Sequence, residues 1–173
     1  MLDSVGVEIG GSHIYVLGEA EEPDGYIKIG VHYGKPSGIG RNGLASGNWR
    51  QLTVLHHHRL PEDTVRWHEF VIHKHLEPWR KKREWFDARP LLGAPGAWGD
   101  LLDRAFRREV PGGATVDLGS QEHQLLRIRM VSWRPPREIV AECSCGYAMH
   151  AARTTLPAVY GHFLKDHCRL GAK

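Results

Sequence analysis

Hydrophobic and polar residues alternate with a period of two in three stretches near the start of the chain, and this pattern predicts β-strands. The first two stretches are SHIYVLG (12–18) and YIKIGVH (26–32), and the segment between them contains Pro23-Asp24-Gly25, a typical turn sequence. We therefore expect a β-hairpin here. The third stretch, RQLTVLHHHRL (50–60), predicts another strand.

A helical period replaces the alternation after Pro61. Acidic residues in the first turn and basic residues at the end follow the charge order that the helix dipole favours, so we expect a helix from Pro61 to about Trp79. The segment GAWGDLLDRAFRREV (96–110) shows the same period and predicts a second long helix. A glycine-rich stretch leaves room for a short helix at about 39–45.

The sequence Pro111-Gly112-Gly113 ends the second helix and is the best candidate for a domain boundary. Beyond it, LLRIRMVSW (125–133) and EIVAECSCG (138–146) predict two strands joined by a proline-containing turn, and we expect a helix over about 157–168. The pattern as a whole predicts an α+β chain with a small hairpin-and-helix module at its C-terminal end.

Composition adds a preference for an anionic partner. The chain has 173 residues, 41% of them hydrophobic, and a net charge of +3. The basic excess lies at the end, where residues 127–173 hold eight Lys and Arg against three Asp and Glu. This excess is compatible with binding a polyanion. We see neither an apolar run long enough for a membrane span nor a leader pattern, and we expect a cytoplasmic protein.

One carboxylate interrupts the apolar stripe of the helix expected after Pro61. Glu69 lies between Val65 and Ile72 on that stripe, and His73 follows one turn later on the same side. A carboxylate in this position is costly unless it is paired or bound to a cation. It either pairs with a neighbouring arginine or binds a hard divalent cation such as Mg²⁺.

Several short motifs occur together in order. They are Tyr15 in the run IYVL, KIG at 28–30, Arg41, Glu69 and EWF at 84–86. Together they resemble the GIY-YIG nuclease superfamily, and in particular its compact phage and meiotic-gene branch. The resemblance covers about residues 12–90. It implies a three-stranded antiparallel sheet flanked by helices and an endonuclease that cleaves DNA phosphodiester bonds with one divalent metal, Mg²⁺ or Mn²⁺.

The resemblance also implies roles for individual residues. Glu69, supported by His73, would hold the metal, and Arg41 would stabilise the charge that grows on the phosphate. Tyr15 would position or activate the attacking water, and Gly30 would let the backbone pass close to the site. Lys28 stands where the second signature has tyrosine, so the general base would be Lys28 or Tyr15.

Plainer interpretations stand beside these. Tyr15 fits a half-buried strand aromatic, Arg41 a solvated arginine and Gly30 a bulge. His13 stands where the first signature has glycine, and together with Lys28 this departure favours a non-catalytic nucleic-acid- or protein-binding module on the same fold. The triplet at 56–58 places successive histidines on opposite faces of a strand, so the three cannot converge on one ion.

All three cysteines lie near the C-terminus. Cys143 and Cys145 precede a glycine, and His162 and His167 follow in the last predicted helix, so these four residues predict a zinc site. Cys168 is an alternative fourth ligand. The layout of residues 138–170 resembles a Cys₂His₂ zinc finger, and the metal would supply much of its folding free energy.

Other interpretations of the C-terminal module remain open. His150 is a further candidate ligand, and the cysteines could also be incidental thiols of an unliganded tail. The surrounding arginines suit contacts with a nucleic-acid backbone, whereas a finger that docks another protein is the competing interpretation. We thus expect four parts: a nuclease-like domain (12–90), a helical extension (91–110), a linker (111–122) and a basic zinc-binding module (123–173).

Overall fold

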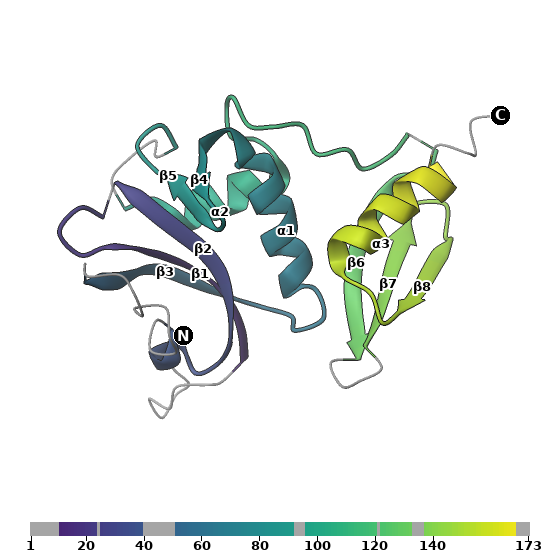
Figure 1. Ribbon diagram of the computed structural model, residues 1–173, viewed down its shortest axis with the longest axis horizontal. Coiled ribbons are helices and arrows are strands. Elements are labelled where there is room, and N and C mark those ends of the chain that lie inside the picture. The colour runs from purple at the N-terminus through teal and green to yellow at the C-terminus, as the bar shows by residue number, and fades with distance from the viewer. Residues whose placement is uncertain are drawn as a thin grey trace. The chain divides into compact units, whose positions relative to one another are not determined.

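A computed structural model describes residues 11–23, 25–39, 51–91, 96–120, 122–132 and 137–168, with only the backbone of Cys168 (Figure 1). The chain forms two compact units. Unit 1 consists of the described residues up to Pro61 together with His68–Val116, and unit 2 consists of Glu62–Trp67 and the described residues from Asp117 onward. Within the described segments, no helix has the length and apolar character that crossing a membrane requires.

Unit 1 is built on one antiparallel sheet with the strand order β3-β1-β2-β5-β4. Its strands are β1 (Gly11–Glu19), β2 (Tyr26–Gly34), β3 (Leu52–Leu60), β4 (Arg80–Lys82) and β5 (Trp85–Asp87). The expected hairpin is present, with Tyr15 opposite Gly30. The expectation of a three-stranded sheet was wrong, because the short strands β4 and β5 extend it to five.

The helix expected from Pro61 to Trp79 is shorter in the structure. Helix α1 spans Val65–His75, and a 3₁₀ turn, Glu77–Trp79, follows it. Pro78 lacks the N–H that would continue the α-helix, so the chain leaves the helix and the basic residues after it form β4. Helix α2 spans Trp98–Arg107, close to the expected range. A 3₁₀ turn, Pro36–Gly38, follows β2, and most of the short helix expected at 39–45 lies outside the described residues.

The two faces of the β1–β2 hairpin bury different sets of side chains. Ile14, Val16, Ile27 and Ile29 belong to the main core of unit 1 together with residues of both helices, among them Ile72, Leu101 and Leu102. Tyr15, Leu17 and Ile39 form a small separate cluster. Since successive strand residues point to opposite faces, the helices cover one face and the Tyr15 side chain lies on the other.

Unit 2 is a three-stranded antiparallel sheet, β6-β7-β8, with one helix. Its elements are β6 (Leu125–Ser132), β7 (Glu138–Cys143), β8 (Ala148–Ala152), α3 (Leu156–Phe163) and a π-helical turn (Leu164–Cys168). The expected hairpin was incomplete, because β8 adds a third strand. Its small alanines carry little strand propensity, and pairing with β7 after a turn at Gly146, where φ is +88°, accounts for the strand. Figure 1 shows α3 packed along one face of this sheet.

Candidate functional site

Four side chains of unit 2 converge as a candidate metal centre. His123, Cys143, Cys145 and His167 each offer one ligand atom, and these atoms all lie within 4.8 Å of one another. Within the cluster, Cys145 Sγ lies 3.3 Å from His167 Nε2. Two sulfurs and two imidazole nitrogens are a ligand set that tetrahedral zinc accepts. The cluster can therefore hold a metal ion.

The two cysteines are placed by a tight turn at the end of β7. The Gly146 N–H donates to the Cys143 carbonyl at 3.0 Å, and the Cys143 N–H donates to the Tyr147 carbonyl at 2.9 Å. The pKa of the Cys145 thiol is lowered to about 6, mainly by a hydrogen bond from the Tyr147 N–H and further by contacts with Cys143, His123 and His167. Cys145 is therefore mostly thiolate at neutral pH, and the thiolate is the form that ligates metal.

His123 lies just before β6 and is held through its neighbours. Its backbone N–H donates to Ser120 Oγ at 3.1 Å, while Gln124 and Ser144 exchange hydrogen bonds of 3.0 and 2.8 Å between the two segments. Its ring nitrogen Nδ1 is buried and has no hydrogen-bond partner within the part of the chain that the structure describes. Coordination to a metal would satisfy such a buried nitrogen.

His167 comes from the π-helical turn after α3, and aromatic rings fix its orientation. The Tyr147 ring stacks on it with centroids 4.2 Å apart and planes 22° apart, and the Phe163 ring lies at 5.3 Å. The His123 ring approaches edge-on at 4.8 Å. The His167 ring is thus positioned by packing against the rings of Tyr147, Phe163 and His123.

The structure replaces one of the expected ligands. The His162 side chain is 70% exposed and lies 3.8 Å from the Asp166 carboxylate, outside the cluster, where the structure has His123 instead. His123 lies far from the cysteines in the sequence, and only the pairing of Leu125 with Cys143 brings it close. That pairing is a tertiary signal that ligand spacing does not contain. The Cys168 side chain, the alternative ligand, lies outside the described residues.

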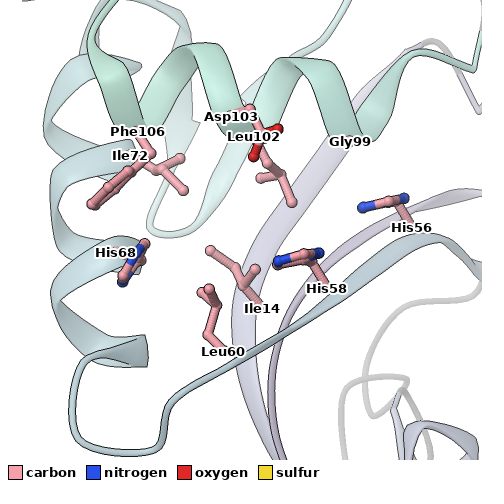
Figure 2. A pocket seen from close by; sticks show the side chains of 10 residues that line it. All are labelled: Ile14, His56, His58, Leu60, His68, Ile72, Gly99, Leu102, Asp103 and Phe106. Atoms are coloured by element: carbon pink, nitrogen blue, oxygen red, sulfur yellow. The ribbon is translucent and has the colours of Figure 1, made fainter. Parts of the chain in front are cut away.

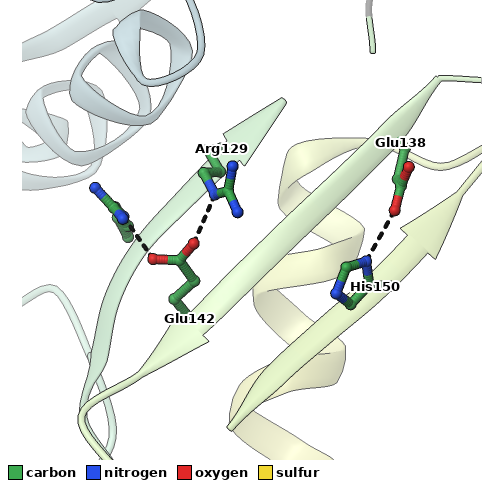
Figure 3. A network of polar contacts seen from close by, with 5 residues as sticks. Arg129, Glu138, Glu142 and His150 are labelled. Carbon is green, nitrogen blue, oxygen red and sulfur yellow. Dashed lines mark hydrogen bonds and ion pairs between the residues drawn. The ribbon is translucent and has the colours of Figure 1, made fainter. Parts of the chain in front are cut away.

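His150 does not join the metal cluster either. Its Nδ1 lies 2.8 Å from the Glu138 carboxylate (Figure 3). On the neighbouring strands, Glu142 accepts hydrogen bonds of 2.6 Å from Arg127 and from Arg129, and these bonds, that of Arg127 first, hold the pKa of the Glu142 carboxyl below its usual range. One carboxylate thus offsets part of the positive charge on this sheet.

In unit 1, the expected catalytic residue Tyr15 meets the expected supporting residue Gly30 across the hairpin. Tyr15 is only 4% exposed, and a Cβ added at Gly30 would lie 2.6 Å from its hydroxyl oxygen and 2.8 Å from Cζ. The tyrosine ring therefore occupies the space that a side chain at position 30 would fill. Nearby in β2, Lys28 is 15% exposed and its Nζ lies 2.9 Å from a Glu84 carboxylate oxygen.

Glu69 and His73 lie on α1 close to the same part of β2. Glu69 is 7% exposed. The His73 Nε2 is 2.9 Å from the Ile29 carbonyl, and burial lowers the pKa of His73 although the charge of Glu69 opposes the shift. The His73 ring is therefore mainly neutral at pH 7. Arg41 lies outside the described residues.

The three histidines of β3 separate as strand alternation predicts. His56 and His58 line a cavity of about 200 Å³ together with Ile14, His68 and Asp103 (Figure 2). His57 lies opposite Tyr15 and contacts His13, with ring centroids 5.5 Å apart, on the other face.

No family model, curated protein or solved structure matches the chain.

Proposed function

We propose that the chain is a metal-dependent nuclease that hydrolyses phosphodiester bonds in DNA, with unit 2 folded around zinc as a nucleic-acid-binding module. The observation that carries the nuclease proposal is that Tyr15 packs over Gly30 beside Lys28 on one face of the β1–β2 hairpin, while the α1 residues His73 and Glu69 lie on its other face, where His73 contacts the Ile29 carbonyl. Tyr15, Lys28 and Glu69 are among the residues on which the resemblance to GIY-YIG nucleases depends.

The chemistry assigned to this site is the addition of water to phosphorus. One P–O ester bond breaks, and the products are a phosphate monoester and a hydroxyl group. Glu69 is the residue that would hold Mg²⁺ or Mn²⁺, since it is a buried carboxylate and a hard divalent cation prefers carboxylate oxygens. The bound cation would stabilise negative charge on the phosphoryl oxygens.

Tyr15 and Lys28 take different roles in this proposal. Lys28 is held in an ion pair with Glu84, so we assign it to holding the phosphate group rather than to accepting a proton. Tyr15 lies on the same face as Lys28, opposite α1, so we assign its buried ring to supporting the hairpin beside Lys28 rather than to acting on water at a metal held by Glu69.

The nuclease proposal is tested on a panel of single-stranded, double-stranded and branched DNA and matching RNA. Purified protein is incubated with each substrate in Mg²⁺, in Mn²⁺ or in EDTA. We expect cleavage of DNA that depends on the divalent ion and disappears in EDTA. Tight DNA binding without cleavage in any divalent ion would instead support the non-catalytic module.

Zinc binding rests on a separate observation, the convergence of the four ligand atoms within 4.8 Å. Unit 2 has a small core, and metal binding would supply much of its folding free energy. We expect one zinc per chain by elemental analysis, lost in His123→Ala and kept in His162→Ala. The matched pair separates the observed ligand set from the one predicted by spacing, and metal-free folded protein would contradict both.

A further inference from the structure

His13 is a buried side chain whose two ring nitrogens satisfy no hydrogen bond. The residue is 3% exposed, and neither Nδ1 nor Nε2 has a partner within the part of the chain that the structure describes. Burying a polar group without a partner costs free energy, so such a group in a native fold calls for a ligand or another explanation. The expectation from the resemblance was glycine at this position.

The surroundings of His13 are basic. Strand pairing places His32 and Arg59 directly opposite His13 on its two neighbouring strands. His57 contacts its ring edge-on, and Tyr15 follows two residues later on the same face. Three basic side chains from two strands therefore surround one buried imidazole on the face of the sheet that carries Tyr15.

The charge of this group favours an anion over a cation. Burial is the largest cause that lowers the pKa of His13, and His57, His32 and Arg59 lower it further, so the charged neighbours that act on the ring are bases. The Arg59 side chain crosses the start of β1, where a Cβ added at Gly11 would lie 2.8 Å from Nε. Arg59 makes no ion pair with any residue in the described ranges. A guanidinium at this position would repel a metal cation and attract a phosphate oxygen.

We propose that His13, His57 and Arg59 form a binding site for a phosphate group of the nucleic-acid backbone. The inference rests on the proposed nuclease function and deepens it by naming the group that the sheet face would hold. A neutral His13 donates one N–H to an anionic oxygen, and Arg59 contributes a charge-assisted hydrogen bond. Because the contact is to phosphate, it positions the strand and reads no sequence.

The first test measures binding separately from cleavage. A fluorescent double-stranded DNA is titrated in EDTA, so that no substrate is consumed, against wild type, His13→Phe, Arg59→Gln and the control His58→Phe. The control makes the same exchange on β3 but on the opposite face, where His58 lines the cavity in Figure 2. We expect roughly tenfold weaker binding for His13→Phe, a salt slope of log K reduced by about one for Arg59→Gln, and wild-type binding for His58→Phe.

A second measurement follows the ring nitrogens of His13 directly by ¹⁵N NMR during titration with inorganic phosphate. Shifts confined to His13 and His57 support the site even if no substrate is cleaved, in which case the nuclease proposal alone fails. Arg59 is exposed, so Arg59→Gln leaves the core intact. The site would be overturned, even if cleavage is observed, by two results together: histidine signals that phosphate does not change, and an Arg59→Gln protein that binds DNA with the affinity and salt slope of wild type.

Discussion

The contact between Tyr15 and Gly30 leads to a stability prediction that follows from two distances. A methyl group at position 30 would lie 2.6 Å from the tyrosine hydroxyl oxygen and 2.8 Å from Cζ, closer than non-bonded atoms approach. The ring is buried, so it must shift against its neighbours. Overpacking of this kind costs about 1–3 kcal/mol. The lower chain entropy of alanine offsets about 0.5–1 kcal/mol, and we expect Gly30→Ala to destabilise unit 1 by about 1–2 kcal/mol.

The assay is urea unfolding followed by the amide signals of β1 and β2, which report on unit 1. Gly161→Ala is the control, because nothing lies within 4 Å of the added Cβ and the residue is in α3 of unit 2, so that exchange should stabilise unit 2, as followed by the amide signals of α3. In a Tyr15→Leu background the ring is gone, and Gly30→Ala should cost much less than in wild type. A Gly30→Ala protein as stable as wild type, or an equal cost in both backgrounds, would refute the reasoning.

Two further predictions concern polar contacts. The Glu142 carboxyl has a pKa below its ordinary value of 4.5, which the unfolded chain retains. The ionised Glu142 carboxylate therefore stabilises the fold fully above about pH 4.5, and this stabilisation is lost as the pH falls through the lower pKa of the folded state. The unfolding free energies of wild type and Glu142→Gln should differ by up to about 1 kcal/mol at pH 7 and converge in acid. A difference that grows in acid would contradict this. His75 donates from Nδ1 to the Ala114 carbonyl at 2.9 Å and accepts the Val110 N–H at Nε2 at 3.1 Å. His75→Phe leaves both partners unsatisfied and should cost about 2–4 kcal/mol in urea unfolding of unit 1, whereas a loss under about 0.5 kcal/mol would show that these bonds do not stabilise the fold.

Local sequence patterns predicted most of the strands and helices correctly, because alternation and helical period record which side chains are buried. They failed at residues 80–82. Basic residues after a helix are as compatible with its last turn as with an exposed strand, and the interruption at Pro78 followed by pairing with β5 decides between the two. They also failed at β8, whose alanines carry no clear strand pattern.

The metal centre shows the same limit. Cys143, Cys145 and His167 were predicted from spacing, and the structure brings all three together. His162 also had suitable spacing but lies on an exposed side of α3, and His123 could be found only from the pairing of β6 with β7. Ligand spacing along the chain describes contacts within one element, whereas a ligand from another strand depends on register.

The nuclease proposal is tested most directly by the single-turnover rate of DNA cleavage in Mg²⁺ for wild type, Glu69→Gln and Glu62→Gln, all loaded with zinc. Glu62 is exposed and receives the same isosteric exchange, so it controls for the loss of one charge. We predict that Glu69→Gln retains the fold and loses on the order of 10²-fold or more in rate, while Glu62→Gln matches wild type. Equal rates for Glu69→Gln and wild type would contradict the assignment of the metal to Glu69.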